Sequence, residues 1–550
     1  MKQTKHFQFW PTYLTKTITI PESTVYNNLL VSAKRYPEKN VLEYYGLSMT
    51  YKTLLESTNH LAEFMRKEWD IQKDDRIMIF MQNSPQYFIA LFAILKLGAI
   101  VVPINPMSTK SELSYYMTEG NIHHAIVGQE LMPSVESFTN EQLQVIVATY
   151  NDYVNEEQSI GQLPNEVKLS FQRFEHTIAW KDIFDQTFEK IDFNKDEGES
   201  NHLAIMPYTS GTTGEPKGCL HTNRSIQANI VGSSHWMSMT TNSVSLTTLP
   251  LFHVTGLIHS GLAPIFTGST IVLMTRWDKE YAACAIEHYR CTNWINISTM
   301  VIDFLSNPYI HDYNLSSLMI VGGGGAALPE AVGQRLFELT GLKYIEGYGL
   351  SETMSHTHFN PVHRPKLQCL GIPAFDVDAR ILDVETGEQL GINEEGELIV
   401  HAPQMFIGYD GRNNEDTFIE IEGKKFFKTG DIVVVDEEGY FFIVDRIKRM
   451  INASGFKVWP SEVESILYRH HAVQQACVVR SYDKKRGETV KALIILKDEY
   501  VGKVSEEDII NWSKKEMAAY KYPRIVEFWD TFPMTSSGKV LWKQLQDKMV

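Results

Sequence analysis

The chain has 550 residues, of which 43% are hydrophobic, and a formal charge of −16 at pH 7. This length allows several domains with large hydrophobic cores. The acidic balance argues against a nucleic-acid scaffold, because binding to nucleic acid requires clustered basic residues that neutralise phosphates. The five cysteines are odd in number, widely spaced and free of any C-x-x-C pair, so the sequence predicts a reducing, cytoplasmic setting and no zinc site.

Targeting and membrane-spanning patterns are weak. Residues 1–20 carry lysines and aromatic residues without an uninterrupted apolar run, so neither a secretory signal nor an anchor is expected. The most hydrophobic window, residues 87–104, approaches transmembrane length but contains Lys96, Gly98 and Pro103, which argues against a membrane span. Peripheral contact with a membrane stays open.

The first third of the chain alternates between apolar runs and helical patterns. Ser84-Pro85 suits the start of a helix, so we expect a helix at residues 85–97 and a buried strand at 99–102. Alternating strands and helices predict parallel sheets covered by helices, which is an α/β fold. The other expected strands of this region are residues 76–80, 125–127 and 144–147.

The loop Tyr208-Thr-Ser-Gly-Thr-Thr-Gly-Glu-Pro-Lys-Gly218 is the most informative stretch of the chain. An expected strand at residues 203–206 precedes it, so the loop should leave a sheet edge. Its glycines let backbone N–H groups turn inward, and its hydroxyls and Lys217 supply donors and charge, so we predict a polyphosphate site. A solvated linker is the alternative. A Walker A loop is excluded, because Glu215 and Pro216 separate Gly214 from Lys217.

A second glycine-rich stretch supports a rival interpretation. An expected strand at residues 318–321 leads into Gly322-Gly-Gly-Gly-Ala-Ala327 and a helix from Pro329, which fits G-x-G-x-x-A, and Glu346 lies about where a ribose contact would fall. A nicotinamide-dependent oxidoreductase is therefore the alternative from another class. It would leave the loop at residues 208–218 and Lys539 without a role.

The loop at residues 208–218 resembles the phosphate-binding loop of the adenylate-forming (AMP-binding) superfamily. Six further stretches resemble the motifs of that superfamily in the same order along the chain. They are Leu249-Pro-Leu-Phe-His253, Gly347-Tyr-Gly-Leu-Ser-Glu-Thr353, Lys428-Thr-Gly-Asp431, Asp445-Arg-Ile-Lys448, Ser454-Gly455 and Ser537-Gly-Lys539.

The resemblance implies roles for individual residues. The β- and γ-phosphates of ATP would be held by Thr209, Ser210, Gly211, Thr212, Thr213, Gly214 and Lys217. The rest of the nucleotide would be surrounded by Gly324, Gly325 and Ala326 at adenine, Glu346, Gly347, Tyr348, Gly349, Ser351, Asp431 at the ribose, and Arg446. Glu352 would bind Mg²⁺, and an oxygen ligand suits that ion. Serine stands at Ser351 where threonine is commoner, which leaves only fine positioning in doubt.

The resemblance implies roles for four further residues. Lys539 would be catalytic, and His253 would sit at the mouth of the acid-substrate pocket. Lys448 matches the hinge position, and Gly455 would face the active site when coenzyme A (CoA) reacts.

The resemblance also implies the division of the chain. A large domain, residues 1–445, would hold parallel α/β subdomains and a β-barrel-like part. Residues 446–550 would form a small, mobile α+β domain that carries Lys539. Within it, a helix opens at residues 461–464. The other expected elements are strands at 476–479 and 491–496 and a helix at 505–516.

The implied activity is ATP-dependent formation of acyl-AMP, followed by thioester formation with CoA and release of AMP and pyrophosphate. The opening Trp10-Pro-Thr-Tyr-Leu14 resembles bacterial long-chain fatty-acid–CoA ligases, so the acid is predicted to be a medium- to long-chain fatty acid. The apolar stretch 254–266, with Trp236 upstream, could line its pocket. Aryl acids such as coumarate and a stand-alone acyl-AMP ligase remain alternatives. The expected partners are the acid, ATP and CoA.

Overall fold

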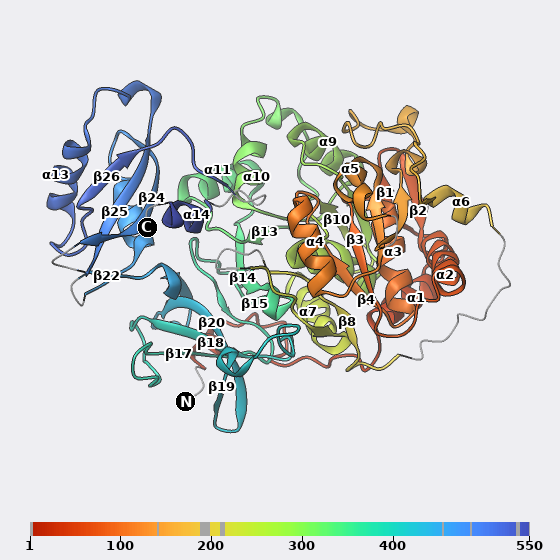
Figure 1. Cartoon of the computed structure of the whole chain (residues 1–550), viewed down its shortest axis with the longest axis horizontal. Helices are drawn as coiled ribbons and strands as arrows, with labels where there is room; N and C mark the ends of the chain where they lie inside the picture. Colours follow the sequence, from red (N-terminus) through yellow and green to blue (C-terminus); the bar gives the residue numbers. More distant parts are fainter. Residues whose placement is uncertain are drawn as a thin grey trace.

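The computed structural model describes residues 4–139, 142–186, 198–209, 215–453, 456–483, 487–534 and 540–548. Figure 1 shows two large parallel sheets with their helices on the right, an antiparallel sheet at the lower left and a separate C-terminal unit at the upper left. The expected fold class, parallel α/β layers followed by a separate small α+β unit, is confirmed.

The first sheet has seven strands in the order β7-β6-β5-β3-β4-β8-β9, and only β9 runs antiparallel to its neighbour. The expected strands are present with shifts of a residue or two. The strands are β3 (Arg76–Phe80), β4 (Ile100–Pro103), β5 (His124–Gly128), β6 (Gln144–Ala148), β7 (Thr177–Ala179), β8 (Leu203–Ile205) and β9 (His221–Thr222). The helices of this region are α2 (Tyr51–Glu68), α3 (Pro85–Lys96), α4 (Lys110–Glu119), α5 (Met132–Val135) and α6 (Trp180–Phe184).

Helix α3 is the most hydrophobic helix of this region and joins the two parallel sheets. The Ser84 hydroxyl caps it by accepting from the backbone N–H of Tyr87, and Pro85 occupies its first turn. All its residues before Lys96 are buried. The Asn83 amide and the Tyr87 hydroxyl bond to backbone carbonyls of the second sheet region, at Leu249 and Leu251. Among the residues that the structure describes, no helix is both long enough and apolar enough to cross a lipid bilayer.

The second sheet has nine strands in the order β16-β15-β14-β13-β12-β10-β11-β1-β2, with a parallel centre and antiparallel ends. Its strands are β1 (Asn40–Tyr44), β2 (Leu47–Thr50), β10 (Val244–Thr247), β11 (Thr270–Leu273), β12 (Asn293–Asn296), β13 (Ile320–Gly324), β14 (Ile345–Leu350), β15 (Ser355–Phe359) and β16 (Ile372–Pro373). The helices are α1 (Val25–Arg35), α7 (Asn223–Trp236), the π-helix η6 (Gly256–Leu262), α8 (Ala263–Thr267), α9 (Lys279–Tyr289), α10 (Ser298–Leu305) and α11 (Glu330–Thr340).

The strand-rich segment after residue 377 forms an antiparallel sheet of five strands in the part of the chain where a barrel-like unit was expected. Its strands are β17 (Asp378–Leu382), β18 (Gly396–His401), β19 (Phe418–Ile421), β20 (Lys424–Val435) and β21 (Phe441–Arg446). Strand β21 continues through the expected domain boundary to Arg446.

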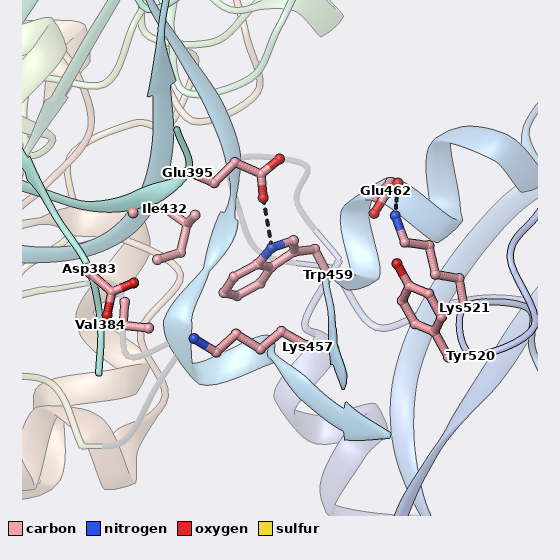
Figure 2. Close-up of a pocket in the computed structure, with 10 residues that line it drawn as sticks. Asp383, Val384, Glu395, Ile432, Lys457, Trp459, Glu462, Tyr520 and Lys521 are labelled. Carbon is pink, nitrogen blue, oxygen red and sulfur yellow. Dashed lines mark hydrogen bonds and ion pairs between the residues drawn. The ribbon is translucent and has the colours of Figure 1, made fainter. Parts of the chain in front are cut away.

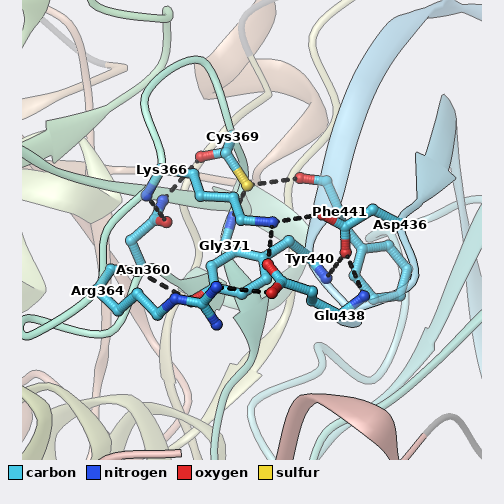
Figure 3. A network of polar contacts seen from close by, with 9 residues as sticks. All are labelled: Asn360, Arg364, Lys366, Cys369, Gly371, Asp436, Glu438, Tyr440 and Phe441. Atoms are coloured by element: carbon cyan, nitrogen blue, oxygen red, sulfur yellow. Dashed lines mark hydrogen bonds and ion pairs between the residues drawn. The ribbon is translucent and has the colours of Figure 1, made fainter. Parts of the chain in front are cut away.

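A polar network ties this antiparallel sheet to the nine-stranded sheet (Figure 3). Lys366 lies 2.5 Å from Asp436 and 2.7 Å from Glu438, and Arg364 lies 2.6 Å from Glu438. The buried Cys369 thiol donates to the backbone carbonyl of Phe441 at 3.2 Å. The segment that follows β15 is thereby held against the turn between β20 and β21.

The C-terminal unit has its own sheet, in the order β23-β22-β25-β24 with β26 beside β25, and its own apolar core. The expected helix from residue 505 is α13, which Ser505 caps in a capping box with Asp508. The strands are β22 (Ile451–Ala453), β23 (Phe456–Val458), β24 (Val473–Asp483), β25 (Gly487–Leu496) and β26 (Ile525–Phe528), and the helices are α12 (Pro460–Leu467), α13 (Glu506–Glu516) and α14 (Trp542–Asp547).

Candidate functional site

The predicted phosphate loop connects β8 to β9 at the edge of the seven-stranded sheet. Its two ends are clasped together: the Thr209 N–H donates to the Lys217 carbonyl at 2.9 Å, and the Lys217 N–H donates to the Thr209 hydroxyl at 3.1 Å. The central residues of the predicted site lie outside the described residues. They are Ser210, Gly211, Thr212, Thr213 and Gly214.

The side chains of Glu352 and Lys217 both contact the same tyrosine. Glu352 lies in the 3₁₀ turn η8 (Ser351–Thr353) directly after β14. The Tyr409 hydroxyl donates to Glu352 Oε1 at 2.6 Å, and the Lys217 ammonium lies 4.5 Å from the centre of the Tyr409 ring. Burial raises the pKa of Glu352, and the Tyr409 hydrogen bond opposes that shift. The predicted metal ligand and the predicted phosphate-binding cation are therefore brought together.

Three predicted nucleotide residues form a second cluster nearby. The Tyr348 hydroxyl donates to Asp431 Oδ2 at 2.6 Å, and Arg446 Nε lies 2.8 Å from Asp431 Oδ1. The attraction of Asp431 raises the pKa of Arg446. These residues come from β14, β20 and β21, so two sheets contribute to the cluster. The buried carboxylate can accept hydrogen bonds from hydroxyl groups of a ligand, and the arginine beside it can bind an anionic group of the same ligand.

The predicted adenine-lining glycines lie beside β14. Gly324 pairs with Gly347 across the two parallel strands β13 and β14. A Cβ atom on Gly324 would lie 2.5 Å from the Gly347 carbonyl oxygen, and Gly325 has a φ of +83°, which favours glycine. Ala326 follows in the turn before α11. The run therefore reaches the segment that carries Tyr348.

Glu346 and Ser351 take part in bonds that shape this segment. Glu346 is buried, and its two carboxylate oxygens accept from the N–H groups of Leu328 at 2.7 Å and Cys369 at 2.9 Å. Burial raises the pKa of Glu346 against the effect of these donors. The Ser351 carbonyl lies 2.8 Å from Nε2 of the buried His221. The contacts of Glu346 and Ser351 with a nucleotide remain predictions.

The region predicted to hold the acid contains more polar side chains than expected. His253 is exposed and lies just before η6. Within η6, the buried His259 has Nδ1 2.7 Å from the Ser233 hydroxyl and Nε2 2.9 Å from the Ser355 hydroxyl. Burial lowers the pKa of His259 to about 3, so the ring is neutral. Trp236, upstream of this region, is fully buried.

Lys448 lies at the start of the C-terminal unit, near the charge of Lys217. It lies in the 3₁₀ turn η10 (Ile447–Arg449), and its carbonyl accepts from Arg480 of β24 at 3.1 Å. Burial and the nearby charges of Lys217, Lys543 and Arg446 lower the pKa of Lys448. Gly455 and Lys539, predicted to act from this unit, lie outside the described residues.

A cavity of about 260 Å³ lies between the C-terminal unit and the antiparallel sheet (Figure 2). The Trp459 indole N–H donates to Glu395 Oε2 at 3.1 Å across this junction, and Lys457 lies 2.8 Å from Glu385. The residues that line this cavity include none of the predicted site residues. These contacts therefore hold the two units in the arrangement seen here.

The donors present fit a Mg²⁺ ion held jointly with a substrate. In the ranges that the structure describes, there is no group of three or more histidine, cysteine, aspartate or glutamate side chains able to hold a metal. Mg²⁺ commonly takes one or two carboxylates, substrate phosphates and water. Glu352, next to Lys217 of the predicted phosphate loop, suits that mode of binding.

Sequence reasoning missed Tyr409 and the residues that fix it. Arg76 forms a two-pronged ion pair with Asp410 at 2.6 and 2.8 Å, which ties β3 to this segment. Gly408 and Gly411 flank Tyr409-Asp410, a pattern that predicts a turn and carries no sign of the chemistry.

The sequence profile of the AMP-binding enzyme family matches residues 29–410, and that of the AMP-binding enzyme C-terminal domain matches residues 462–539. A long-chain-fatty-acid–CoA ligase of Bacillus subtilis (strain 168) is 32% identical over 98% of this chain and 97% of its own. A feruloyl-CoA synthase of Amycolatopsis sp. is 27% identical over 92% of this chain and 96% of its own.

Among solved structures, the chain is similar to o-succinylbenzoate CoA synthetase of Bacillus subtilis in complex with its acyl-adenylate intermediate. The TM-score is 0.80 and the identity 25%, and the match covers 96% of this chain and 99% of that one.

Proposed function

The chain belongs to the AMP-binding enzyme family of adenylate-forming acyl-CoA ligases, and we propose that its acid is a medium- to long-chain fatty acid. This membership displaces the nicotinamide-dependent alternative. The observation that carries the activity is the convergence of Lys217, Glu352 and the Tyr348–Asp431–Arg446 cluster from segments far apart in the chain. The fatty acid is supported by similarity over nearly the whole chain to a long-chain-fatty-acid–CoA ligase.

The chemistry needs two steps, because a carboxylate is a poor electrophile at neutral pH. A carboxylate oxygen of the acid attacks the α-phosphorus of ATP, the bond to the bridging oxygen of the β-phosphate breaks, and pyrophosphate leaves. The CoA thiol, which gives up its proton, then attacks the acyl carbon, and the bond to the AMP oxygen breaks. The products are the thioester and AMP.

The following candidate residues would act in the first step. The loop at residues 209–214 and Lys217 would hold the β- and γ-phosphates, with Tyr348 beside adenine. Asp431 would accept the ribose hydroxyls. Glu352 would hold Mg²⁺, which supplies charge stabilisation at the phosphates. Lys539 would approach the oxygens of the α-phosphate and the carboxylate.

We propose that the chain divides between residues 445 and 446, and that the C-terminal unit turns about Lys448 between the two steps. Gly455 would then leave room for the pantetheine arm of CoA. The separate core of the C-terminal unit supports this division. The position of Lys448 between β21 and β22 supports its role as the pivot.

Aryl acids are the second candidate substrate class. The His259–Ser233–Ser355 group gives the pocket region buried polar side chains, which suit an acid that carries a polar substituent. A relative acts on a feruloyl group, as its name states.

A panel of free acids supplied with ATP, Mg²⁺ and CoA, with AMP release recorded for each, tests the proposal. Faster release with longer saturated chains supports the fatty acid, and a marked preference for coumarate supports the aryl acid. Acid-dependent release of pyrophosphate with accumulation of acyl-AMP, and no CoA-dependent release of AMP, would indicate an acyl-AMP ligase.

A further inference from the structure

The main chain around Tyr409 is fixed from several sides. Residues 407–410 run antiparallel to the end of the phosphate loop, where the Asp410 N–H donates to the Gly218 carbonyl at 2.9 Å and the Ile407 N–H donates to the Leu220 carbonyl at 3.0 Å. The Asn414 side chain accepts from the Tyr409 N–H at 2.8 Å and donates to the Tyr409 carbonyl at 3.1 Å. A side chain on so constrained a backbone can hold a neighbour in a defined orientation.

The Tyr409 side chain makes one contact with each of its two charged neighbours. Its hydroxyl donates to Glu352 Oε1 at 2.6 Å, and its ring face carries the Lys217 ammonium at 4.5 Å. The ring is itself packed edge-on against Phe406, with 4.9 Å between ring centres. The Phe406 N–H donates to the Glu352 carbonyl at 2.8 Å, so the same segment also holds the Glu352 main chain.

A carboxylate that binds a metal through one oxygen can rotate unless its other oxygen is held. Mg²⁺ tolerates little departure from octahedral geometry, so the orientation of its ligand matters. Groups that hydrogen-bond a ligating side chain typically change metal affinity by about 10- to 100-fold when removed. A lysine ammonium over an aromatic face is likewise restrained by the attraction of the ring.

We propose that Tyr409 is a positioning residue that orients the Glu352 carboxylate toward Mg²⁺ and steadies Lys217 at the phosphates of ATP. Tyr409 acts through these two side chains and does not touch the substrate. The inference rests on the proposed binding of ATP and Mg²⁺ and is independent of which acid the enzyme activates. Tyr409 would thereby connect the proposed Mg²⁺ ligand, Glu352, with the proposed phosphate-binding lysine, Lys217.

Calorimetry with an α,β-methylene analogue of ATP, titrated with and without Mg²⁺, tests the proposal without turnover. Tyr409→Phe keeps the ring and loses the hydroxyl. It should lose about tenfold or more of the Mg²⁺-dependent gain in affinity and change the Mg²⁺-free affinity by less than about twofold. Tyr409→Leu also loses the ring and should weaken Mg²⁺-free binding as well. Tyr115→Phe is the control, since the Tyr115 hydroxyl contacts the Pro216 carbonyl of the same loop.

A double-mutant cycle that combines Tyr409→Phe with Glu352→Gln decides whether Tyr409 acts through Glu352. In that background Tyr409→Phe should cause no further loss of the Mg²⁺ effect. An additional loss there, or wild-type behaviour of Tyr409→Phe alone, overturns the proposal. A thermal unfolding midpoint for each variant shows whether it is folded, and Tyr409→Leu in the same cycle substitutes if Tyr409→Phe is not. Failure of every acid in the AMP-release panel, with this result intact, would refute only the proposed substrate.

Discussion

Lys539 is the residue at which the two half-reactions should separate most clearly. Lys539→Ala should nearly abolish acyl-AMP formation, because loss of a cation at the transition state typically costs about 10² to 10³ in rate. Thioester formation from supplied acyl-AMP should be largely kept. Pyrophosphate exchange measures the first step, and Lys515→Ala, on the exposed face of α13, is the control. Exchange at the wild-type rate in Lys539→Ala would contradict the assignment.

Glu130 should make stability depend on pH away from the candidate site. The Tyr150 hydroxyl donates to Glu130 at 2.9 Å, and burial raises the pKa of Glu130 to about 7. The folded state therefore holds this proton more tightly than the unfolded state. The resulting stabilisation is complete below the ordinary glutamate pKa and is lost as the pH rises through about 7.

The test of this pH effect is Glu130→Gln, which keeps an acceptor for Tyr150 but cannot titrate. Between pH 5 and 8 the wild type should lose at most about 3 kcal/mol more unfolding free energy than the variant, because folding raises the pKa of Glu130 to about 7. Urea unfolding at each pH measures the difference. Glu437→Gln, at an exposed turn, is the control. Parallel pH curves for wild type and Glu130→Gln would rule out Glu130 as the source.

At the scale of secondary-structure elements, apolar runs predicted the parallel strands well, and capping residues predicted α3 and α13. The motif that begins at Gly347 is different: β14 covers Ile345–Leu350 and contains the Gly-Tyr-Gly-Leu part of the motif. The run of glycines there hides strand propensity, and pairing with β15 supplies the missing stabilisation. Contacts between segments far apart in the chain have no local signal, which is why Tyr409 was missed.

Gly349 tests whether this pairing positions the site. A Cβ atom on Gly349 would lie 1.7 Å from the Ser355 carbonyl oxygen, so Gly349→Ala must push β14 away from β15. We expect a loss of about 1–3 kcal/mol in unfolding free energy, as for overpacked sites. We also expect slower acyl-AMP formation, because Glu352 lies in the turn that follows β14. Gly391→Ala is the control, since its added methyl would meet only the flexible Glu394 carboxylate. Full activity in Gly349→Ala would show that the pairing of β14 with β15 does not position the site.

At the scale of the whole molecule, the sequence motifs located most candidate residues but not the contacts between the two units. The junction in Figure 2 joins them through the Trp459–Glu395 hydrogen bond. If the C-terminal unit turns during the reaction, this bond stabilises only one of the two arrangements. Trp459→Phe should then change the ratio of the two half-reaction rates by about fivefold, for a loss on the order of 1 kcal/mol. Trp512→Phe, within the C-terminal unit, is the control, and an equal effect on both half-reactions would exclude a role in the rearrangement.

The proposed rotation requires that the backbone at Lys448 is free to change conformation between the two steps. Lys539 is needed at the α-phosphate in the first step, but CoA must reach the same carbonyl carbon once pyrophosphate has left, so a fixed lysine loop would block its route. A hinge-type rearrangement can be absorbed by a few dihedral angles. Lys448→Pro fixes φ at the pivot, and Gly455→Leu fills the space proposed for the pantetheine arm.

Both variants should keep acyl-AMP formation and lose most CoA-dependent turnover, which is the reverse of Lys539→Ala. Lys448 lies close enough to Lys217 for their charges to interact, so Lys448→Gln is needed to separate the loss of charge from the loss of rotation. If rotation is the cause, Lys448→Gln should keep both half-reactions, since its backbone remains free. Thioester formation from supplied acyl-AMP at the wild-type rate in Gly455→Leu would show that CoA does not pass this glycine, and the two arrangements of the C-terminal unit would then have no role in the second step.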